Sequence, residues 1–197
     1  MEHYDEAYFD RWYRDPETCV SSAEGTLRKA SMALSVAEYY LERPVRTVLD
    51  VGCGEGNWLH SLQALRPAIT YVGIDSSSYA VSRYGETRNI RLGSFATMEE
   101  IGLADNTYDL IICSDTLAYV SSEELDTGLA SLSKRANGIA FLELYTKSDP
   151  MGGDNPVEAR PAAFYRSLLQ RHGFVSVGSH CYLGPTLVHQ AMEMERQ

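Results

Sequence analysis

The sequence contains no apolar run near the roughly 20 residues that a membrane-spanning helix needs. Its first residues are acidic and aromatic, and they lack the basic start and apolar core of a signal peptide. Positive charge is also scarce, since 17 Lys and Arg face 27 Asp and Glu, giving a net charge of −10. These absences predict a cytoplasmic protein without a membrane or nucleic-acid partner, because phosphates require a basic footprint.

Clustered cysteines and clustered arginines are missing as well. Four widely separated cysteines form no CxxC pair, which disfavours a metal knuckle or a disulfide framework and predicts reduced structural thiols. Asp149 and Asp154 do not have the spacing of a metal-binding loop, so no metal is predicted. Arg160, Arg166 and Arg171 fall at near-helical spacing and predict a solvated helix face rather than a phosphate-binding stripe.

What the chain does contain is an alternation of short β-branched runs and helical patterns. Strands are predicted at 45–51, 69–74, 90–92, 108–113 and 138–145. Helices are predicted at 25–41, from the glycine-rich turn to about residue 65, and at 77–85, 123–134 and 159–172. Two last strands, 174–182 and 186–192, are predicted to pair around Gly184-Pro185. This order predicts a Rossmann-like, doubly wound α/β fold. Its seven-stranded sheet is mostly parallel with an antiparallel last strand.

The predicted organisation is an N-terminal helical extension over residues 1–44 and a single structural unit over residues 45–197. The extension begins with a stripe of aromatic residues at helical spacing, which includes Tyr8, Phe9, Trp12 and Tyr13. Such a stripe is typical of a helix packed on a sheet, and it equally suits a cover over a ligand.

The most informative stretch runs from Val48 to Trp58, where a buried strand leads through a glycine-rich turn into a helix. A dinucleotide-binding turn, as in an NAD-dependent oxidoreductase, would place its third glycine at position 57, which is Asn57 here. Asp50, just before the turn, suits the α-ammonium of an amino acid better than a pyrophosphate. The pattern resembles motif I, D-x-G-x-G-x-G, of the class I S-adenosylmethionine-dependent methyltransferases.

This resemblance implies S-adenosylmethionine as the cofactor. Motif I implies contacts to the methionine moiety and its turn from Asp50, Gly52, Cys53, Gly54, Asn57 and Trp58. Asp75 ends the next strand nineteen residues after Gly56, and it is expected with Ser76 at the ribose. The family's adenine contacts correspond to Ser94 and Phe95. Its fourth strand, which passes under the cofactor, corresponds to the stretch ending in Cys113, Ser114 and Asp115.

The acceptor side carries fewer signals. An N-P-P-Y type motif is absent after the fourth strand, which disfavours methylation of adenine or glutamine amino groups. The histidine pair of many small-molecule relatives is replaced by Ala118 and Tyr119, so a histidine base is excluded there. Tyr119 is interpreted either as an acceptor-orienting hydroxyl or as a packed aromatic.

Glu143 lies in an otherwise apolar strand and is interpreted as a general base, an acceptor-binding group or a structural acid. Tyr145, two residues on, points the same way and is a candidate acceptor contact, together with Tyr8, Trp12, Tyr13 and Tyr119. The turn-rich loop 146–156 is interpreted as a lid or as a plain connection.

The sequence therefore predicts an enzyme that moves a methyl group to O, N or C of a small molecule. Two alternatives stay open: a protein or RNA methyltransferase of the same fold, and a non-catalytic S-adenosylmethionine-binding module.

Overall fold

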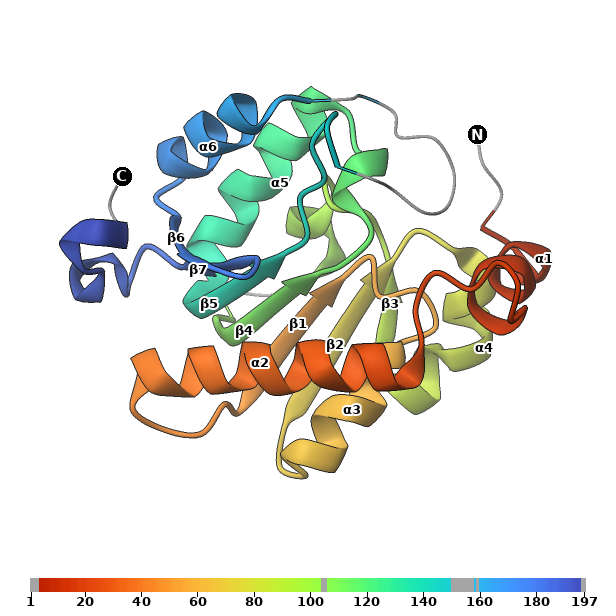
Figure 1. Cartoon of the computed structure of the whole chain (residues 1–197). Helices are drawn as coiled ribbons and strands as arrows, with labels where there is room; N and C mark the ends of the chain where they lie inside the picture. Colours follow the sequence, from red (N-terminus) through yellow and green to blue (C-terminus); the bar gives the residue numbers. More distant parts are fainter. Residues whose placement is uncertain (1–3, 104–105, 150–157, 159, 196–197) are drawn as a thin grey trace.

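A seven-stranded sheet with the strand order β3-β2-β1-β4-β5-β7-β6 forms the centre of the molecule (Figure 1). The computed structural model describes residues 4–103, 106–149, 158 and 160–195. The strands are β1 (Thr47–Val51), β2 (Thr70–Asp75), β3 (Ile90–Leu92), β4 (Tyr108–Cys113), β5 (Ala136–Leu142), β6 (Val175–Gly178) and β7 (Cys181–Leu183). Strands β1 to β5 are mutually parallel, and β7 runs antiparallel to both β5 and β6. The predicted Rossmann-like fold is confirmed.

Helices cover both faces of the sheet, as a buried parallel sheet requires. On one face pack α2 (Ala23–Leu41) and α3 (Asn57–Leu65), and on the other α5 (Ser122–Arg135) and α6 (Ala162–Arg171) (Figure 1). The helix α4 (Ser78–Arg88) lies beside β2 and β3. Strand β4 serves both cores, because its alternate side chains point to opposite faces: Ile111 packs in the α5/α6 core and Leu110 in the α2/α3 core.

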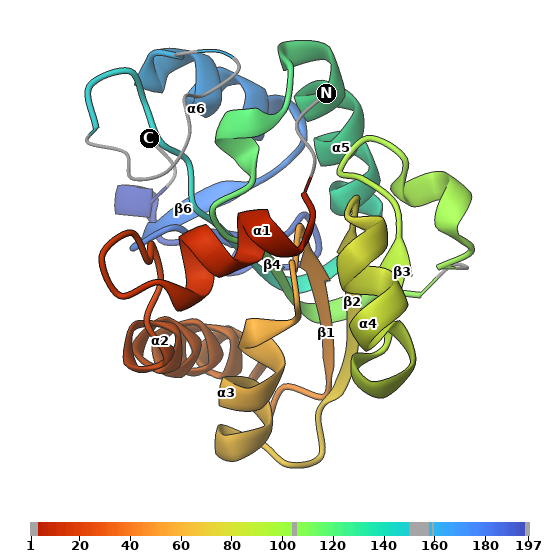
Figure 2. The same ribbon diagram turned by 90° about the vertical axis from the view of Figure 1, so that its right-hand side faces the viewer.

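The N-terminal segment consists of α1 (Glu6–Phe9) and a π-helical continuation, η1 (Asp10–Arg14). Asp5 caps α1 by accepting a hydrogen bond from the amide of Tyr8. Figure 2 shows α1 lying across the end of the sheet, above the region between β1 and β4. By contrast, α2 belongs to the main core, where Ala30, Ala33 and Leu34 are almost completely buried.

The C-terminal strand pair differs from the sequence prediction. The hairpin turns at Ser179 and His180, both with positive φ, and not at Gly184-Pro185. Residues 186–192 form turns and a short 3-10 helix, Val188–Gln190, rather than a strand. Two consecutive positive φ angles fit a two-residue hairpin loop, but Ser-His is not one of the glycine- or asparagine-containing pairs that signal it.

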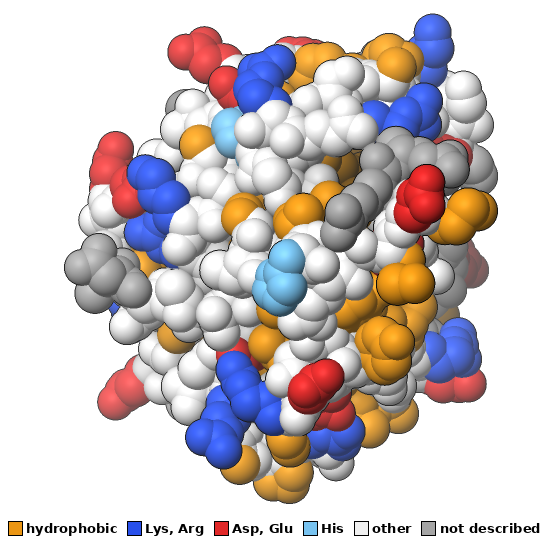
Figure 3. Space-filling model, turned by 90° about the vertical axis from the view of Figure 1, so that its left-hand side faces the viewer, with side chains coloured by type: hydrophobic (Ala, Val, Ile, Leu, Met, Phe, Trp, Pro, Cys, Tyr) orange, Lys and Arg blue, Asp and Glu red, His pale blue; other side chains and the backbone are white. Residues whose placement is uncertain are grey.

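The predicted solvated arginine face is also wrong for Arg160, which is only 3% exposed. Its guanidinium donates hydrogen bonds to the carbonyls of Leu117 and Val120 and to the hydroxyl of Ser122. Arg160 thereby ties the segment before α6 to the loop that follows β4. Charged side chains elsewhere are dispersed: the face of the molecule in Figure 3 shows Lys and Arg scattered among acidic side chains.

Candidate active site

The glycine-rich turn after β1 leads directly into α3. Gly52, Gly54 and Gly56 all have positive φ, at 74°, 55° and 79°, a region that side chains other than glycine rarely adopt. Space is also short at Gly52, where an added Cβ would lie 2.0 Å from Thr116 Oγ1. The amides of Gly52 and Cys53 donate to the carbonyl of Ile74 at 2.8 and 3.0 Å, which fixes the turn against β2.

A first cavity of about 420 Å³ opens above this turn, at the carboxyl ends of the strands. Ligands in doubly wound folds bind at this edge, near the switch in strand order between β1 and β4. The lining residues come from the N-terminal segment, the turn after β1, the last residue of β2, the chain that follows β2, β3 and β4, and the start of α5; among them are Gly52, Gly54, Asp75, Ser76, Ser94 and Phe95.

Asp75 supplies a buried carboxylate to this cavity. Its Oδ2 accepts a hydrogen bond from the amide of Gly54 at 2.6 Å, and its Oδ1 accepts one from the amide of Ser77 at 2.8 Å. Burial raises the pKa of Asp75, and the two amide hydrogen bonds oppose that rise. The carboxylate is thus held in a fixed orientation beside the glycine turn.

A second cavity of about 430 Å³ adjoins the first. Tyr8, Tyr13, Asp115 and Tyr119 line both cavities and therefore form their common boundary. The other residues of the second cavity are Trp12, Glu17, Thr18, Cys19, Val20, Ala118 and Tyr145. The predicted acceptor contacts Tyr8, Trp12, Tyr13, Tyr119 and Tyr145 are thus brought together in one place.

Asp115 occupies the boundary in a strained conformation, with a φ of 54° in a residue other than glycine. Its Oδ1 accepts a hydrogen bond from the hydroxyl of Tyr145 at 3.2 Å. Burial and the nearby charge of Glu143 raise the pKa of Asp115, while Lys29, Tyr145 and His180 oppose the rise. Such strain, when it is found at a cavity, points to a functional position.

The N-terminal segment closes the first cavity from above. The hydroxyl of Ser77 donates to the carbonyl of Tyr4 at 2.5 Å, and the ring of Phe9 stacks on that of Tyr79 with centroids 5.8 Å apart. Arg14 forms an ion pair with Glu55 in the glycine turn. Burial, together with the charges of Tyr8 and Asp115, raises the pKa of Tyr13. This segment, residues 4–14, is called the strap below.

Residues 25–191 match the family model described as "Methyltransferase domain". The chain belongs to this family. The match confirms the predicted resemblance to the class I S-adenosylmethionine-dependent methyltransferases and, with it, the predicted cofactor. No sequence among the curated proteins matches the chain.

Solved structures share the fold of this methyltransferase at low sequence identity. The sugar N-methyltransferase KedS8 from Streptoalloteichus sp. ATCC 53650 is 14% identical, with a TM-score of 0.64 over 89% of this chain and 86% of that one. Magnesium protoporphyrin IX methyltransferase from Synechocystis PCC 6803, with bound S-adenosylhomocysteine, is 20% identical, with a TM-score of 0.56 over 91% and 93%. An O-methyltransferase family protein from Burkholderia thailandensis is 14% identical, with a TM-score of 0.55; 82% of this chain aligns with 56% of that one, so this chain spans little more than half of its length.

Several residues that motif I assigns to the cofactor lie outside the first cavity of the methyltransferase. Asp50 is 1% exposed and accepts a hydrogen bond from the hydroxyl of Tyr71 at 2.8 Å. Burial raises the pKa of Asp50 to about 7, the Tyr71 hydroxyl lowers it, and the charge of Asp75 raises it. Cys53, Asn57 and Trp58 do not line the cavity either: Cys53 is buried, Trp58 packs against Phe141, and Asn57 is exposed in the first turn of α3.

Of the predicted cofactor contacts near the end of β4, one lines the cavities and two do not. Asp115 lines both cavities, whereas Cys113 is buried in the core and Ser114 donates a hydrogen bond to Glu143. Glu143, just after β5, is 4% exposed and pairs with Lys29 of α2 at 2.7 Å. Neither cavity includes Glu143 among its lining residues. Of the three interpretations of Glu143, the pairing with Lys29 and Ser114 favours a structural acid, and the role of Glu143 stays a prediction.

The loop predicted as a possible lid, 146–156, lies outside the described residues from 150 onward. Sequence reasoning missed Thr116, Val120 and Glu124 in the first cavity, and Glu17 to Val20 in the second. These residues carry no motif, and only the spatial meeting of the strap with the loop after β4 brings them to the site. Within the part of the chain that the structure describes, no helix is long and apolar enough to cross a bilayer, and no group of three His, Cys, Asp or Glu side chains is placed to hold a metal.

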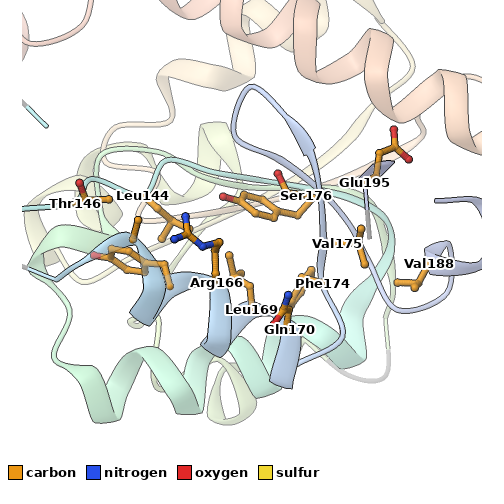
Figure 4. Close-up of a pocket in the computed structure, with 13 residues that line it drawn as sticks. Leu144, Thr146, Arg166, Leu169, Gln170, Phe174, Val175, Ser176, Val188 and Glu195 are labelled. Carbon is orange, nitrogen blue, oxygen red and sulfur yellow. The ribbon is translucent and has the colours of Figure 1, made fainter. Parts of the chain in front are cut away.

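A third cavity, of about 500 Å³, lies away from these residues, between α6 and the C-terminal strands (Figure 4). Leu144 and Thr146 lie at one end of it, Arg166, Leu169 and Gln170 come from α6, and Phe174 to Ser176 come from the chain at β6. None of the predicted site residues lines it.

Proposed function

We propose that this methyltransferase transfers a methyl group from S-adenosylmethionine in the first cavity to a small molecule in the second. The observation that carries the proposal is the common boundary: Tyr8, Tyr13, Asp115 and Tyr119 line both cavities. Methyl transfer needs two ligands whose reacting atoms meet in line with water excluded. Two adjoining cavities of about 420 and 430 Å³ are each within the range that small ligands occupy.

The residues of the first cavity fit the nucleoside of the cofactor. Each carboxylate oxygen of Asp75 accepts one amide hydrogen bond and retains capacity for another, which suits the two ribose hydroxyls. Ser94 and Phe95 lie where the resemblance assigns the adenine, and Phe95 offers a buried ring. The turn at Gly52 and Gly54 allows the backbone to approach the ligand closely. S-adenosylmethionine, when bound, supplies a methyl group already activated by its sulfonium.

The protein's own residues then position the acceptor and exclude water. The strap covers the first cavity, and its Tyr8 and Tyr13 also form part of the boundary. KedS8, which has the same fold, is a sugar N-methyltransferase and so acts on a small molecule. The size of the second cavity and the negative net charge likewise favour a small acceptor over RNA.

Asp75 provides the first test. Replacing Asp75 with Ala removes the acceptor of both ribose hydroxyls, so we expect affinity for S-adenosylhomocysteine to fall about 10- to 100-fold, the effect of losing hydrogen bonds to a charged group. Isothermal titration calorimetry with S-adenosylmethionine, S-adenosylhomocysteine and NAD measures this directly, and NAD should not bind.

Asp126→Asn is the matched control, because it also removes one acidic charge but lies on α5 and is paired with Arg171 and His172. It should bind S-adenosylhomocysteine like the wild type. Tight NAD binding, or unchanged affinity in Asp75→Ala, would contradict the cofactor assignment. A methyl-transfer screen against metabolite, peptide and RNA pools then separates a small-molecule enzyme from the protein or RNA alternative and from a non-catalytic module.

A further inference from the structure

The second cavity has an unusual lining for a site that receives a polar small molecule. Five of its residues are aromatic: Tyr8, Trp12, Tyr13, Tyr119 and Tyr145. Two are acidic, Asp115 at the boundary with the first cavity and Glu17 on the exposed outer side. Among its described lining residues there is no Lys, Arg or His. Aromatic faces and carboxylates are the groups with which proteins bind organic cations.

The surroundings of Asp115 leave its charge unbalanced at the boundary. Lys29 is the nearby cation, but it forms its ion pair with Glu143. Glu143 adds a second negative charge close to Asp115, and His180 opposes the resulting rise in the pKa of Asp115 less than Lys29 does. Tyr145 donates one hydrogen bond to Asp115 Oδ1. Within the part of the chain that the structure describes, Asp115 Oδ2 accepts no hydrogen bond, so the carboxylate can accept a further donor from a ligand.

The ring of Trp12 already contacts one cation. The guanidinium of Arg11 lies 4.5 Å from the Trp12 ring centroid, outside the residues that line the cavity. An anionic acceptor, such as a carboxylate or a phosphate, would face two acids in the second cavity and would find no basic partner among its lining residues. The lining thus selects against anions and favours a donor-bearing, positively charged group.

We infer that the acceptor is an aliphatic or arylalkyl amine that enters the second cavity as an ammonium ion, binds Asp115, and is methylated on nitrogen. The inference rests on the proposed function. Asp115 takes one proton from the ammonium to give the neutral amine and a carboxylic acid. The nitrogen lone pair then forms the new N–C bond as the C–S bond breaks, which leaves a neutral thioether and a methylated ammonium. The proton on Asp115 returns to water.

The test uses three probes of matched size on the protein loaded with S-adenosylhomocysteine: 2-phenylethylamine, 2-phenylethanol and phenylacetate. We expect the amine to bind about 10- to 100-fold more tightly than the alcohol, the usual effect of a charge-assisted hydrogen bond, and phenylacetate to bind most weakly. Ligand-observed NMR titration gives the three dissociation constants. With S-adenosylmethionine in place of the product, mass spectrometry should detect N-methylated 2-phenylethylamine.

Asp115→Asn should abolish the preference for the amine over the alcohol, and titration of the same variant with S-adenosylhomocysteine reports separately on the first cavity, which Asp115 also lines. Asparagine tolerates positive φ and still accepts from Tyr145, so the backbone should persist. Glu24→Gln on α2, whose side chain is 81% exposed, is the charge-matched control and should keep the preference.

The outcomes separate this inference from the function on which it rests. If S-adenosylhomocysteine fails to bind the wild type, the proposed function itself is wrong. If it binds but the alcohol matches the amine, or the amine does not bind, only the amine inference is overturned. A loss of S-adenosylhomocysteine affinity in Asp115→Asn also overturns it, because Asp115 would then hold the cofactor's own ammonium.

Discussion

Asp50 and Asp75 lie near the carboxyl ends of neighbouring strands, but their surroundings differ. In the register of β1 and β2, Asp50 lies opposite Gly73 and Val51 opposite Ile74, so Asp75 lies two positions further toward the carboxyl edge than Asp50. Asp50 also shares the face of Val48, where α2 and α3 pack, because side chains alternate along a strand. Asp75 therefore reaches the first cavity, whereas Asp50 is buried under the turn and held by Tyr71.

The buried Asp50 should make the stability of the ligand-free protein depend on pH. Its folded pKa of about 7 lies above its ordinary unfolded value near 3.9. The folded state therefore binds more protons between about pH 4 and 7, so the free energy of unfolding falls as pH rises through this window. Relative to that of Asp50→Asn, the free energy of unfolding of the wild type should fall by on the order of 3 kcal/mol between about pH 4 and 8, as measured by urea denaturation.

Asp50→Asn is a conservative replacement here, because the amide oxygen can still accept from the Tyr71 hydroxyl. Parallel stability curves for the two proteins across this pH range would show that Asp50 is already charged in the folded state. That result would instead favour a site in which Asp50 awaits the ammonium of the cofactor, as motif I implies.

The burial of Arg160 could not be predicted from the sequence. The near-helical spacing of Arg160 from Arg166 and Arg171 alone placed it on a solvated helix face. In the fold it is buried and receives carbonyl partners from Leu117 and Val120, about 40 residues earlier in the chain. These partners belong to the loop that presents Tyr119 to both cavities. No local pattern can report a partner that only tertiary structure supplies.

At the scale of elements, periodicity predicted most strands and helices because each buries one face or both. Strands β4 and β5 contain continuous apolar runs, at 110–113 and 139–142, and α2 carries apolar residues at helical spacing. The hairpin of β6 and β7 was misplaced because the glycine and proline after it resemble a turn signal more strongly than Ser179 and His180 do. The glycine turn itself was located correctly, since its spacing is dictated by the backbone.

The strap is the element whose role most needs testing. Phe9 is 2% exposed, lines the first cavity, and contacts Gly54 and Tyr79. We expect Phe9→Ala to release the strap locally, so that the dissociation rate of S-adenosylhomocysteine rises at least about ten-fold while the rest of the domain stays folded. Stopped-flow displacement measures the rate, and limited proteolysis should show faster cleavage within residues 4–20.

Phe141→Ala is the control in the main core. Phe141 is fully buried beside Trp58, so its truncation should cost about 3–5 kcal/mol of global stability. Phe9→Ala should lower the melting temperature much less than Phe141→Ala, because a detached strap leaves both sheet cores intact. Equal losses of melting temperature, with unchanged release of S-adenosylhomocysteine, would show that the strap is an integral part of the fold and not a cover.

On the scale of the whole molecule, the fold places both cavities at one edge of the sheet, in a chain that carries a net negative charge. The chain carries −10 overall, and two of its acidic residues, Asp115 and Glu17, line the second cavity, which has no Lys, Arg or His among its described lining residues. A net charge of one sign attracts ligands of the opposite charge and repels ligands of the same charge. This long-range effect is weakened by dissolved salt. The whole-molecule field and the local lining therefore favour the same class of acceptor.

This field predicts a salt dependence that distinguishes the two kinds of ligand. The screening length shortens from about 30 Å at 0.01 M salt to about 8 Å at 0.15 M, so the long-range attraction of 2-phenylethylammonium should weaken several-fold over that range. Neutral 2-phenylethanol should bind with the same affinity throughout. In Asp115→Asn the amine should bind more weakly at every salt concentration, because the contact with Asp115 is lost. The dependence of amine affinity on salt concentration should stay the same, because that contact is partly buried and lightly screened, and the salt dependence comes from the remaining charges. An amine affinity that does not change with salt, or an alcohol affinity that changes equally, would show that the acidic surface plays no part in drawing the acceptor to the site.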